Sequence, residues 1–333
     1  MRKIGIALIG VGPGSQPHLA SLRELHERVD LRWAVARSDI ERVRAAVPPD
    51  TRVTTNLEPV LQDAAVDAVI VATPAHTHLD IAKQTLAAGK HTLVEKPLDV
   101  SLSKAEDLAK FADSTGLRFG VVLQHRFRPG AVRLRQLVES AALGELQAGV
   151  LQVPWWRSQS GYYDQPGRGS VARDGGGVLL TQAIHALDLF RSLVGVREVV
   201  ASRVRTTDIH RIETEDFAAA ILTLGNGAPG VLMATTAMYP GRAESLELVY
   251  TNASVLLVGG TLRVLFHDGR TEVVEGEAKS GSGDSIMDFS PAAHVELLRD
   301  FLDAIMLGRA PTASGTEALE THRLIEKIIA GSR

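Results

Sequence analysis

The chain has 333 residues, of which 45% are hydrophobic and 23% charged, and this composition predicts a folded protein with two domains. Its formal charge is −3 and its Lys and Arg residues are scattered, so we expect no nucleic-acid partner. There is no cysteine, which excludes disulfides and zinc-thiolate sites, and no run of the roughly 18 apolar residues that span a bilayer, so we expect a cytoplasmic protein with no metal site and no membrane partner.

Apolar runs and helical patterns alternate through residues 1–122. We expect strands at residues 4–9, 31–36, near 53, 68–72, 92–94 and 117–123, and helices at 16–29, 40–47, around 81–87 and from 101 onward. In the last of these helices, Ser103 and Glu106 have the spacing of a capping box. The alternation predicts an α/β domain built on a parallel sheet with right-handed crossovers.

A glycine-rich turn lies between the first strand and the first helix. Gly10 permits a tight turn, and Gly12, which has no Cβ, lets the backbone approach a pyrophosphate at the start of the helix. Ser15 stands where the dinucleotide fingerprint has glycine or alanine, and Gly14 comes one place early. We predict that these four residues bind a dinucleotide; a tight turn without a ligand is the alternative.

Arg37 and Ser38 follow the second strand, where NAD-binding domains normally carry an acid for the ribose hydroxyls. A guanidinium and a hydroxyl can bind a 2′-phosphate instead. We therefore predict a preference for NADP(H) over NAD(H), with NAD(H) as the alternative cofactor. Asp39 is a nearby acid, and Arg37 as a simple surface charge is the other interpretation.

The apolar strand at residues 92–94 ends in Glu95, Lys96 and Pro97. Open α/β sheets bind ligands at the carboxyl ends of their strands, and Pro97 cannot continue a strand. The Lys96 amine is therefore expected to face a ligand. A solvated Glu-Lys pair at a turn is the alternative.

Two segments resemble the Gfo/Idh/MocA family of oxidoreductases, namely Thr73-Pro74-Ala75-His76-Thr77-His78 and the run from Ala87 to Pro97. The resemblance implies a Rossmann domain at residues 1–122 and a C-terminal α/β domain at 123–333 whose large, open, mainly antiparallel sheet mediates oligomer contacts. It implies cofactor contacts from Thr73, Pro74, His78, Glu95 and Lys96, with Lys96 near the nicotinamide and the substrate hydroxyl. Family members usually have asparagine where Ala75 stands.

The second half of the chain carries the expected substrate residues. Arg126 lies in a segment, residues 124–129, that the family shares in outline, and a helix is expected at 131–139. A loop rich in aromatic and arginine residues follows, and its members suit the apolar face and hydroxyl edge of a sugar: Trp155, Trp156, Arg157, Tyr162, Tyr163 and Arg168. Core packing of both tryptophans is the alternative.

After Gly175, Gly176 and Gly177 we expect a single helix with two stripes. One stripe is apolar, and the other places Thr181, His185 and Asp188 on a polar face. The stretch resembles the family's active-site helix, which implies that His185 is the catalytic acid/base. Many members have aspartate where Thr181 stands, so we expect Gln182, Tyr163 or a water to take its place; a structural histidine is the alternative.

Beyond residue 194, short runs separated by turn residues predict a sheet of hairpins. We expect strands at 198–205, 216–224, 230–237, 245–251, 253–258 and 261–266, a mobile loop at 279–284, and helices at 292–307 and 316–330. His294 is expected to point either into a cleft or toward solvent.

Together these features predict an oxidoreductase that transfers a hydride between NADP(H) and a secondary alcohol or ketone of a sugar, cyclitol or sugar acid. Lys96 would stabilise the alkoxide, and His185 would exchange the proton. Two alternatives remain: a dehydrogenase of cis-dihydrodiols of aromatic acids, held through Arg157 or Arg168, and a non-catalytic sensor that binds the dinucleotide and a partner protein. The resemblance also implies a homodimer or homotetramer formed through the C-terminal sheet.

Overall fold

The computed structural model describes residues 2–276 and 290–332. The chain forms two compact units, one made of Met1–Gln124 with Pro291–Leu319 and the other of His125–Ser290 with Glu320–Arg333. The expected loop at 279–284 lies outside the described residues.

The first unit is built on a six-stranded parallel sheet, as predicted. Its strand order is β3-β2-β1-β4-β5-β6. From β1 the chain first adds strands on one side and then, from β4 onward, on the other, so the order along the sheet switches between β1 and β4. In doubly wound sheets, the carboxyl ends of the strands at this reversal form the ligand crevice. The strands are β1 (Ile4–Ile9), β2 (Val29–Val35), β3 (Arg52–Thr54), β4 (Ala68–Val71), β5 (His91–Val94) and β6 (Phe119–Val121).

Helices connect these strands, and two of their ends differ from the prediction. The helices are α1 (Gln16–Glu24), α2 (Ile40–Ala46), the unpredicted α3 (Glu58–Gln62), α4 (His78–Ala87) and α5 (Leu102–Thr115). The first ends at Glu24 because the next residues form a turn, in which the Arg28 N–H donates to the Leu25 carbonyl. The predicted capping box in α5 is wrong, since Ser101 is the N-cap and accepts from the Lys104 N–H.

A late segment of the chain completes the first unit, so the predicted division at residue 122 needs correction. The N–H of Val121 donates to the carbonyl of Ala313 at 2.8 Å, which extends the edge of the sheet at β6. Helix α10 (Ala292–Leu307) packs against α1, and Arg28 and Asp303 form an ion pair at 2.5 Å. Residues 291–319 therefore belong with the dinucleotide-type sheet rather than with the second half of the chain.

The second unit is built on an eight-stranded sheet in the order β14-β13-β12-β11-β7-β10-β9-β8. All neighbours are antiparallel except β7 and β10, so the predicted mainly antiparallel sheet is confirmed. The central β7 and the short edge strand β14 were not predicted. The strands are β7 (Leu146–Pro154), β8 (Val196–Arg205), β9 (Phe217–Leu224), β10 (Pro229–Thr235), β11 (Ser245–Tyr250), β12 (Ala253–Val258), β13 (Thr261–Phe266) and β14 (Thr271–Val274).

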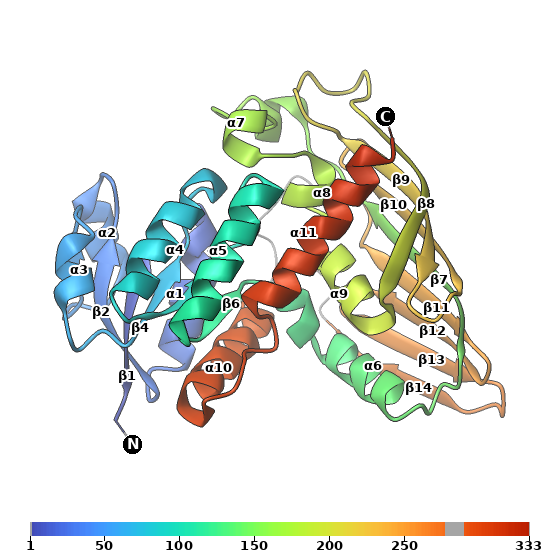
Figure 1. Ribbon diagram of the computed structural model, residues 1–333, viewed down its shortest axis with the longest axis horizontal. Helices are drawn as coiled ribbons and strands as arrows, with labels where there is room; N and C mark the ends of the chain where they lie inside the picture. Colours follow the sequence, from blue (N-terminus) through green and yellow to red (C-terminus); the bar gives the residue numbers. More distant parts are fainter. Residues whose placement is uncertain (1, 277–289, 333) are drawn as a thin grey trace. The chain divides into compact units, whose positions relative to one another are not determined.

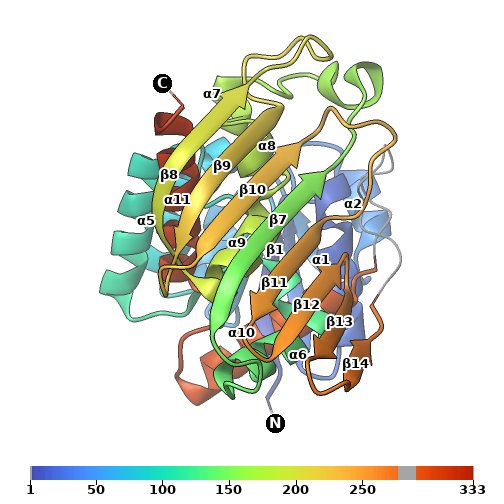
Figure 2. The same cartoon turned by 90° about the vertical axis from the view of Figure 1, so that its right-hand side faces the viewer.

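Helices cover one face of this sheet and leave the other open. Figure 1 shows α6 (Pro129–Glu139) and α9 (Ile184–Val194) on one side of the strands, and Figure 2 shows that no described helix lies over the opposite face. Apolar side chains of these strands, such as Ile221, Val231 and Leu265, are about half exposed. The remaining helices are the short α7 (Val171–Asp174) and α8 (Val178–Thr181), and α11 (Gly315–Ala330), within which the boundary between the units falls.

Among the described helices, no single one is long and apolar enough to cross a membrane. Residues 171–181 and 184–194 have the length and apolar composition of a membrane span only when taken together, as a pair bent by 50°.

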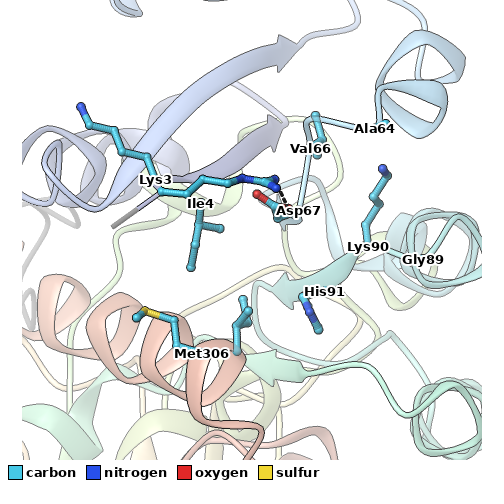
Figure 3. A pocket seen from close by; sticks show the side chains of 11 residues that line it. Lys3, Ile4, Ala64, Val66, Asp67, Gly89, Lys90, His91 and Met306 are labelled. Atoms are coloured by element: carbon cyan, nitrogen blue, oxygen red, sulfur yellow. Dashed lines mark hydrogen bonds and ion pairs between the residues drawn. The ribbon is translucent and has the colours of Figure 1, made fainter.

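A hollow of about 350 Å³ lies at the amino ends of β1, β4 and β5. Lys3, Asp67, Lys90 and His91 are among the residues that line it (Figure 3). The Lys90 amine donates to the carbonyl of Asp63 at 2.8 Å, so this buried charge already serves the loop before β4. Because ligands of such sheets bind at the carboxyl ends of the strands, the hollow is at the wrong edge for the predicted cofactor.

Candidate active site

The turn after β1 has the geometry that a dinucleotide needs. Gly10 has a φ of +93°, and a Cβ on it would come within 2.6 Å of the Ala72 carbonyl oxygen, so only glycine fits. At Gly12 and Gly14 a Cβ would meet no described atom within 4 Å. The backbone there faces open space beside the start of α1, where a pyrophosphate could approach it. The residues present therefore fit a dinucleotide.

Ser15 has a different role from the one predicted. Its side chain is fully buried, and its hydroxyl donates to the Gly12 carbonyl oxygen at 2.8 Å. The serine thus closes the turn from inside. This contact explains how the turn forms without the third glycine of the fingerprint.

Arg37 and Ser38 are exposed in the turn after β2, where the prediction needs them. The neighbouring acid, Asp39, is occupied elsewhere. Its carboxylate accepts from the backbone N–H and the side chain of Arg42 at the start of α2, at 3.4 and 3.0 Å. Asp39 is exposed as well, but of the three polar residues that follow this strand it is the one that bonds to α2.

His78 joins the two loops that follow β4 and β5. Its ring lies between the carbonyl oxygens of Thr73 and Pro97, 2.9 Å from the first and 2.8 Å from the second. The side chain is buried, and burial lowers its pKa. His78 therefore contacts the protein's own backbone rather than facing a cofactor, and it holds the loop containing Thr73 and Pro74 next to the peptide that follows Lys96.

Glu95 and Lys96 emerge from the end of β5, and a histidine that the sequence analysis missed binds the carboxylate. His18 Nε2 lies 2.7 Å from Glu95 Oε1, and the Lys96 backbone N–H donates to Oε2 at 3.2 Å. Burial raises the pKa of Glu95, but the hydrogen bond to His18 and the nearby Lys96 charge more than offset it, so the pKa lies below its ordinary value. An ionised carboxylate thus fixes the backbone of Lys96.

His294 stands behind this pair. It is buried, and its ring meets the ring of His18 edge-on, with the centroids 5.8 Å apart. Of the two orientations expected for His294, the one toward solvent is wrong. The available signal for His18 was its place in the first turn of α1, directly after the glycine turn.

In the second unit, most of the predicted substrate residues gather around Tyr162. The Tyr162 hydroxyl accepts from Gln182 Nε2 at 2.7 Å and from Arg168 Nη1 at 3.1 Å. The guanidinium carbons of Arg168 and Arg157 lie 4.8 and 5.7 Å from the centre of its ring. Burial raises the pKa of Tyr162, so the hydroxyl keeps its proton. Tyr162 therefore links the aromatic loop to the segment after Thr181.

The two tryptophans of the loop divide between the two interpretations. Trp155 is buried, and its indole N–H donates to Glu244 at 3.3 Å, as the core-packing alternative expects. Trp156 is half-buried and meets the exposed Tyr239 edge-on, with ring centres 5.4 Å apart. Trp156 is thus the better placed of the two to contact a ligand.

Tyr163 is not placed to move a proton. Its hydroxyl lies 2.7 Å from the Thr236 hydroxyl in the interior, and burial raises its pKa. Its ring supports the ring of Tyr162 edge-on, at 4.9 Å between centres. We therefore withdraw the catalytic role predicted for Tyr163.

The predicted single helix is wrong, because the chain bends between α8 and α9. The Thr181 hydroxyl bonds back to the Gly177 carbonyl at 2.7 Å and contacts the Gln182 amide. The Ala183 N–H reaches the carbonyl five residues earlier, which interrupts the regular helical ladder. Residues 171–181 and 184–194 are bent by 50° relative to each other, so Thr181 and His185 do not share one straight helical stripe.

Glu215 packs closely against Gly177, the last of the three glycines before α8. A Cβ on Gly177 would lie 1.8 Å from the Glu215 carbonyl oxygen. The Glu215 carboxylate accepts from the backbone N–H groups of Gly177 and Leu179 and so caps α8. Burial raises its pKa.

His185 lies near the start of α9 in a cluster of polar side chains. Its ring stacks on His125, with centres 5.1 Å apart and planes inclined by 30°. His125 Nδ1 lies 3.9 Å from Glu244, which also forms an ion pair with Arg128 at 2.5 Å. His125 and Glu244 were not predicted as site residues, and no sequence motif connects them.

Arg126 and Asp188 form a buried ion pair, so neither contributes to the polar site that was predicted for them. Two nitrogens of Arg126 donate to the two carboxylate oxygens of Asp188 at 2.6 and 2.7 Å, and the Thr321 hydroxyl donates to the same carboxylate. Both side chains are almost completely buried. We therefore do not retain Arg126 as a substrate-binding residue.

Family models match both parts of the chain. The model described as "Oxidoreductase family, NAD-binding Rossmann fold" matches residues 4–123, and the one described as "GFO/IDH/MocA C-terminal domain" matches residues 131–256. The scyllo-inositol 2-dehydrogenase (NAD(+)) of Bacillus subtilis is 26% identical over 266 residues, which is 78% of this chain and 73% of that protein.

Solved structures share the fold along almost the whole chain. The WlbA dehydrogenase from Bordetella pertussis in complex with NADH and UDP-GlcNAcA has a TM-score of 0.83 at 25% identity, over 100% of this chain and 97% of that one. Levoglucosan dehydrogenase in complex with NADH and L-sorbose has a TM-score of 0.88 at 20% identity, with the same coverage. The two family models, together with the fold and the site, show that this chain belongs to the Gfo/Idh/MocA family of NAD-dependent oxidoreductases.

Proposed function

We propose that this protein transfers a hydride between NADP(H) and a secondary alcohol, or the matching ketone, of a sugar, cyclitol or sugar acid. The observation that carries the proposal is the open backbone at Gly12, at the same sheet edge as the Glu95-Lys96 pair. The relatives that act on or bind inositols, sugars and a nucleotide sugar support the substrate class.

The chemistry divides between the cofactor and the side chains. A bound nicotinamide supplies the hydride acceptor or donor. Lys96 places an ammonium beside the substrate oxygen and stabilises the developing alkoxide, while His185 exchanges the proton with that oxygen. Glu95, held by His18, fixes the Lys96 backbone.

The preference for NADP(H) rests on the turn after β2. Arg37 and Ser38 are exposed there, while Asp39 is occupied by Arg42. A guanidinium attracts the 2′-phosphate of NADP, and the acid in that turn, Asp39, is already paired with Arg42. Both solved relatives described above bind NADH, so the preference separates this chain from them.

The surface around Tyr162 suits a polyol. Half-exposed Trp156 offers an aromatic face, and Gln182 and Arg168 offer hydrogen-bond donors. The guanidinium of Arg168 would also hold a carboxylate, which favours a sugar acid, or the cis-dihydrodiol of an aromatic acid as a second candidate.

The open face of the second sheet supports a homo-oligomer. Paired strands present apolar side chains that are about half exposed, including Ile221 opposite Val231. Contiguous exposed apolar side chains are typical of surfaces that associate with another protein. We propose a homodimer or homotetramer formed through this face.

Replacing Gly12 with alanine is expected to weaken dinucleotide binding at least about tenfold without lowering the melting temperature, because the added methyl fills only the space of the ligand. Gly10→Ala is expected to lower the melting temperature, since its Cβ would collide with Ala72. Calorimetric titration with NADP+ and thermal unfolding distinguish the two. Wild-type affinity in Gly12→Ala would place the cofactor elsewhere.

Arg37→Asp is expected to reverse the cofactor preference. Loss of the guanidinium and gain of a carboxylate near the 2′-phosphate should weaken NADP+ binding by about 10–100-fold and leave or strengthen NAD+ binding. The matched control is Arg44→Asp, an exposed arginine on the following helix. Tighter binding of NAD+ than of NADP+ to the wild-type protein would overturn the preference.

Lys96→Met and His185→Gln are each expected to lower turnover by about 10²–10⁴-fold with little change in dinucleotide affinity, because both act on the substrate oxygen. Turnover is followed at 340 nm with a panel of inositols, ketoses, aldonic acids and an aromatic dihydrodiol acid. Lys110→Met and His267→Gln, at exposed positions, are the controls. Near-normal turnover in both site variants refutes these roles, whereas dinucleotide binding with no turnover on any substrate favours the sensor.

The double variant Ile221→Lys with Val231→Lys is expected to shift the protein to a smaller assembly, because two buried charges on neighbouring strands oppose association. Light scattering after gel filtration measures the mass. Leu307→Lys, at an exposed position of α10, serves as the control. A wild-type protein that runs as a monomer contradicts the proposal.

A further inference from the structure

His210 lies in the segment between β8 and β9, and its side chain is fully buried. Nδ1 of its ring lies 2.7 Å from Asp216 Oδ2, and Nε2 lies 2.7 Å from the carbonyl oxygen of Arg157. The ring therefore bridges the start of β9 and the first part of the aromatic loop.

Counting hydrogen-bond donors bears on the charge of this ring. A carboxylate and a carbonyl oxygen only accept hydrogen bonds, and the neutral ring has one N–H whereas the imidazolium has two. His78 also lies between two oxygens, but both are carbonyl oxygens, and neither carries a charge that would balance a second proton. At His210 one of the two acceptors is the carboxylate of Asp216, 2.7 Å away, and this counter-charge allows the ring to donate to both acceptors as an imidazolium.

Several hydrogen bonds hold Asp216 in place. Burial raises its pKa, but hydrogen bonds from His210 and Thr207 more than offset this, so the pKa lies below its ordinary value. The Thr207 N–H and hydroxyl donate to the carboxylate at 2.7 and 2.6 Å. The Asp216 carbonyl accepts from the Thr236 N–H, which ties the start of β9 to the end of β10.

Arg157 of the aromatic loop is bonded to this region through both its backbone N–H and its backbone carbonyl. The Arg157 N–H donates to the Thr236 carbonyl at 2.9 Å, and the Arg157 carbonyl accepts from His210. The centres of the Trp156 and Tyr163 rings lie 5.9 and 4.7 Å from that of His210, within the range of cation–π attraction. Tyr163 in turn supports Tyr162.

We infer that His210 is a positioning residue, a buried imidazolium that holds Trp156, Arg157 and Tyr163 in place and so determines where the loop presents Arg157 and Tyr162 to the substrate. Nothing in the contacts of the ring points to a role in the reaction itself. The inference rests on the proposed function only where it assigns this loop to the substrate.

The charge of the ring is tested by nitrogen NMR on protein labelled with 15N-histidine. The His210 signals are identified by their loss in His210→Gln. Two nitrogens with imidazolium shifts at pH 7.5 are expected for wild type. A neutral tautomer, with one protonated and one unprotonated nitrogen, overturns the inference.

The positioning role is tested by hydrogen exchange. In His210→Gln, which can donate to only one of the two acceptors, the amides of residues 156–163 should exchange at least about tenfold faster, while those in the middle of β9 and β10 keep their wild-type rates. His267→Gln, an exposed histidine of the same unit, should change neither. Unchanged loop exchange, or equal acceleration through the whole unit, contradicts positioning.

A second variant covers the case in which His210→Gln does not fold. In Asp216→Asn the amide can donate to Nδ1, so a neutral His210 still donates to Arg157 through Nε2. We expect the imidazolium signature to disappear and the loop amides to exchange less than about threefold faster than wild type. Persistence of two protonated nitrogens refutes the counter-charge.

A kinetic measurement separates this inference from the proposed function. With the most active polyol of the panel, His210→Gln should raise KM more than it lowers kcat, with NADP+ affinity unchanged. A protein that shows the NMR and exchange results but turns over no substrate retains the positioning role and loses the proposed function. If His210→Gln turns over substrate with an unaltered KM, the proposed function is retained and the positioning role is lost.

Discussion

Parallel pairing of β1, β4 and β5 is the constraint on which the first half of the site depends. Because neighbouring parallel strands end at the same edge, Gly10, Thr73 and Glu95 lie together although they are far apart in sequence. Histidines then complete the edge. His78 joins the loops after β4 and β5 through their carbonyl oxygens, and His18 holds the carboxylate next to Lys96. The backbone that carries the Lys96 side chain is thus fixed before any ligand is bound.

In the second unit, too, side chains hold a functional loop in place by bonding to it from other segments. Its aromatic loop has little regular secondary structure, so its position depends on side chains that reach backbone or hydroxyl groups elsewhere. His210 holds the Arg157 carbonyl, and Gln182 reaches the Tyr162 hydroxyl. Loops that carry binding residues on a rigid sheet need such anchors, because their own hydrogen bonds do not determine one conformation.

The sequence predicts those features that depend on local pattern. Strong alternation gives β12 and β13 with their observed ends, and helical spacing gives α10 at residues 292–307. The glycine turn and the strand end at Glu95 are local too. Strand β7 is not predicted because Gly149 and two glutamines weaken its apolar pattern. In the structure, Phe190 and Leu248 pack closely over that glycine.

Features that depend on distant partners could not be read in this way. Arg126 has the composition of a substrate ligand, but Asp188 neutralises it from 62 positions away. The bend after Thr181 follows from a hydroxyl that bonds to its own helix, a choice that spacing does not reveal. The role of His18 depends on its contact with Glu95, and that of His125 on its stacking against the ring of His185.

The contribution of residues 291–319 to the first unit has a consequence for how the protein is made. Until this segment leaves the ribosome, the outer edge of β6 lacks its Ala313 partner, and the face of α1 that α10 covers stays open. Folding of the nucleotide-type sheet therefore finishes only after the whole eight-stranded sheet has been synthesised. The second unit includes residues 320–333, so it too is completed only by residues that are synthesised after position 319.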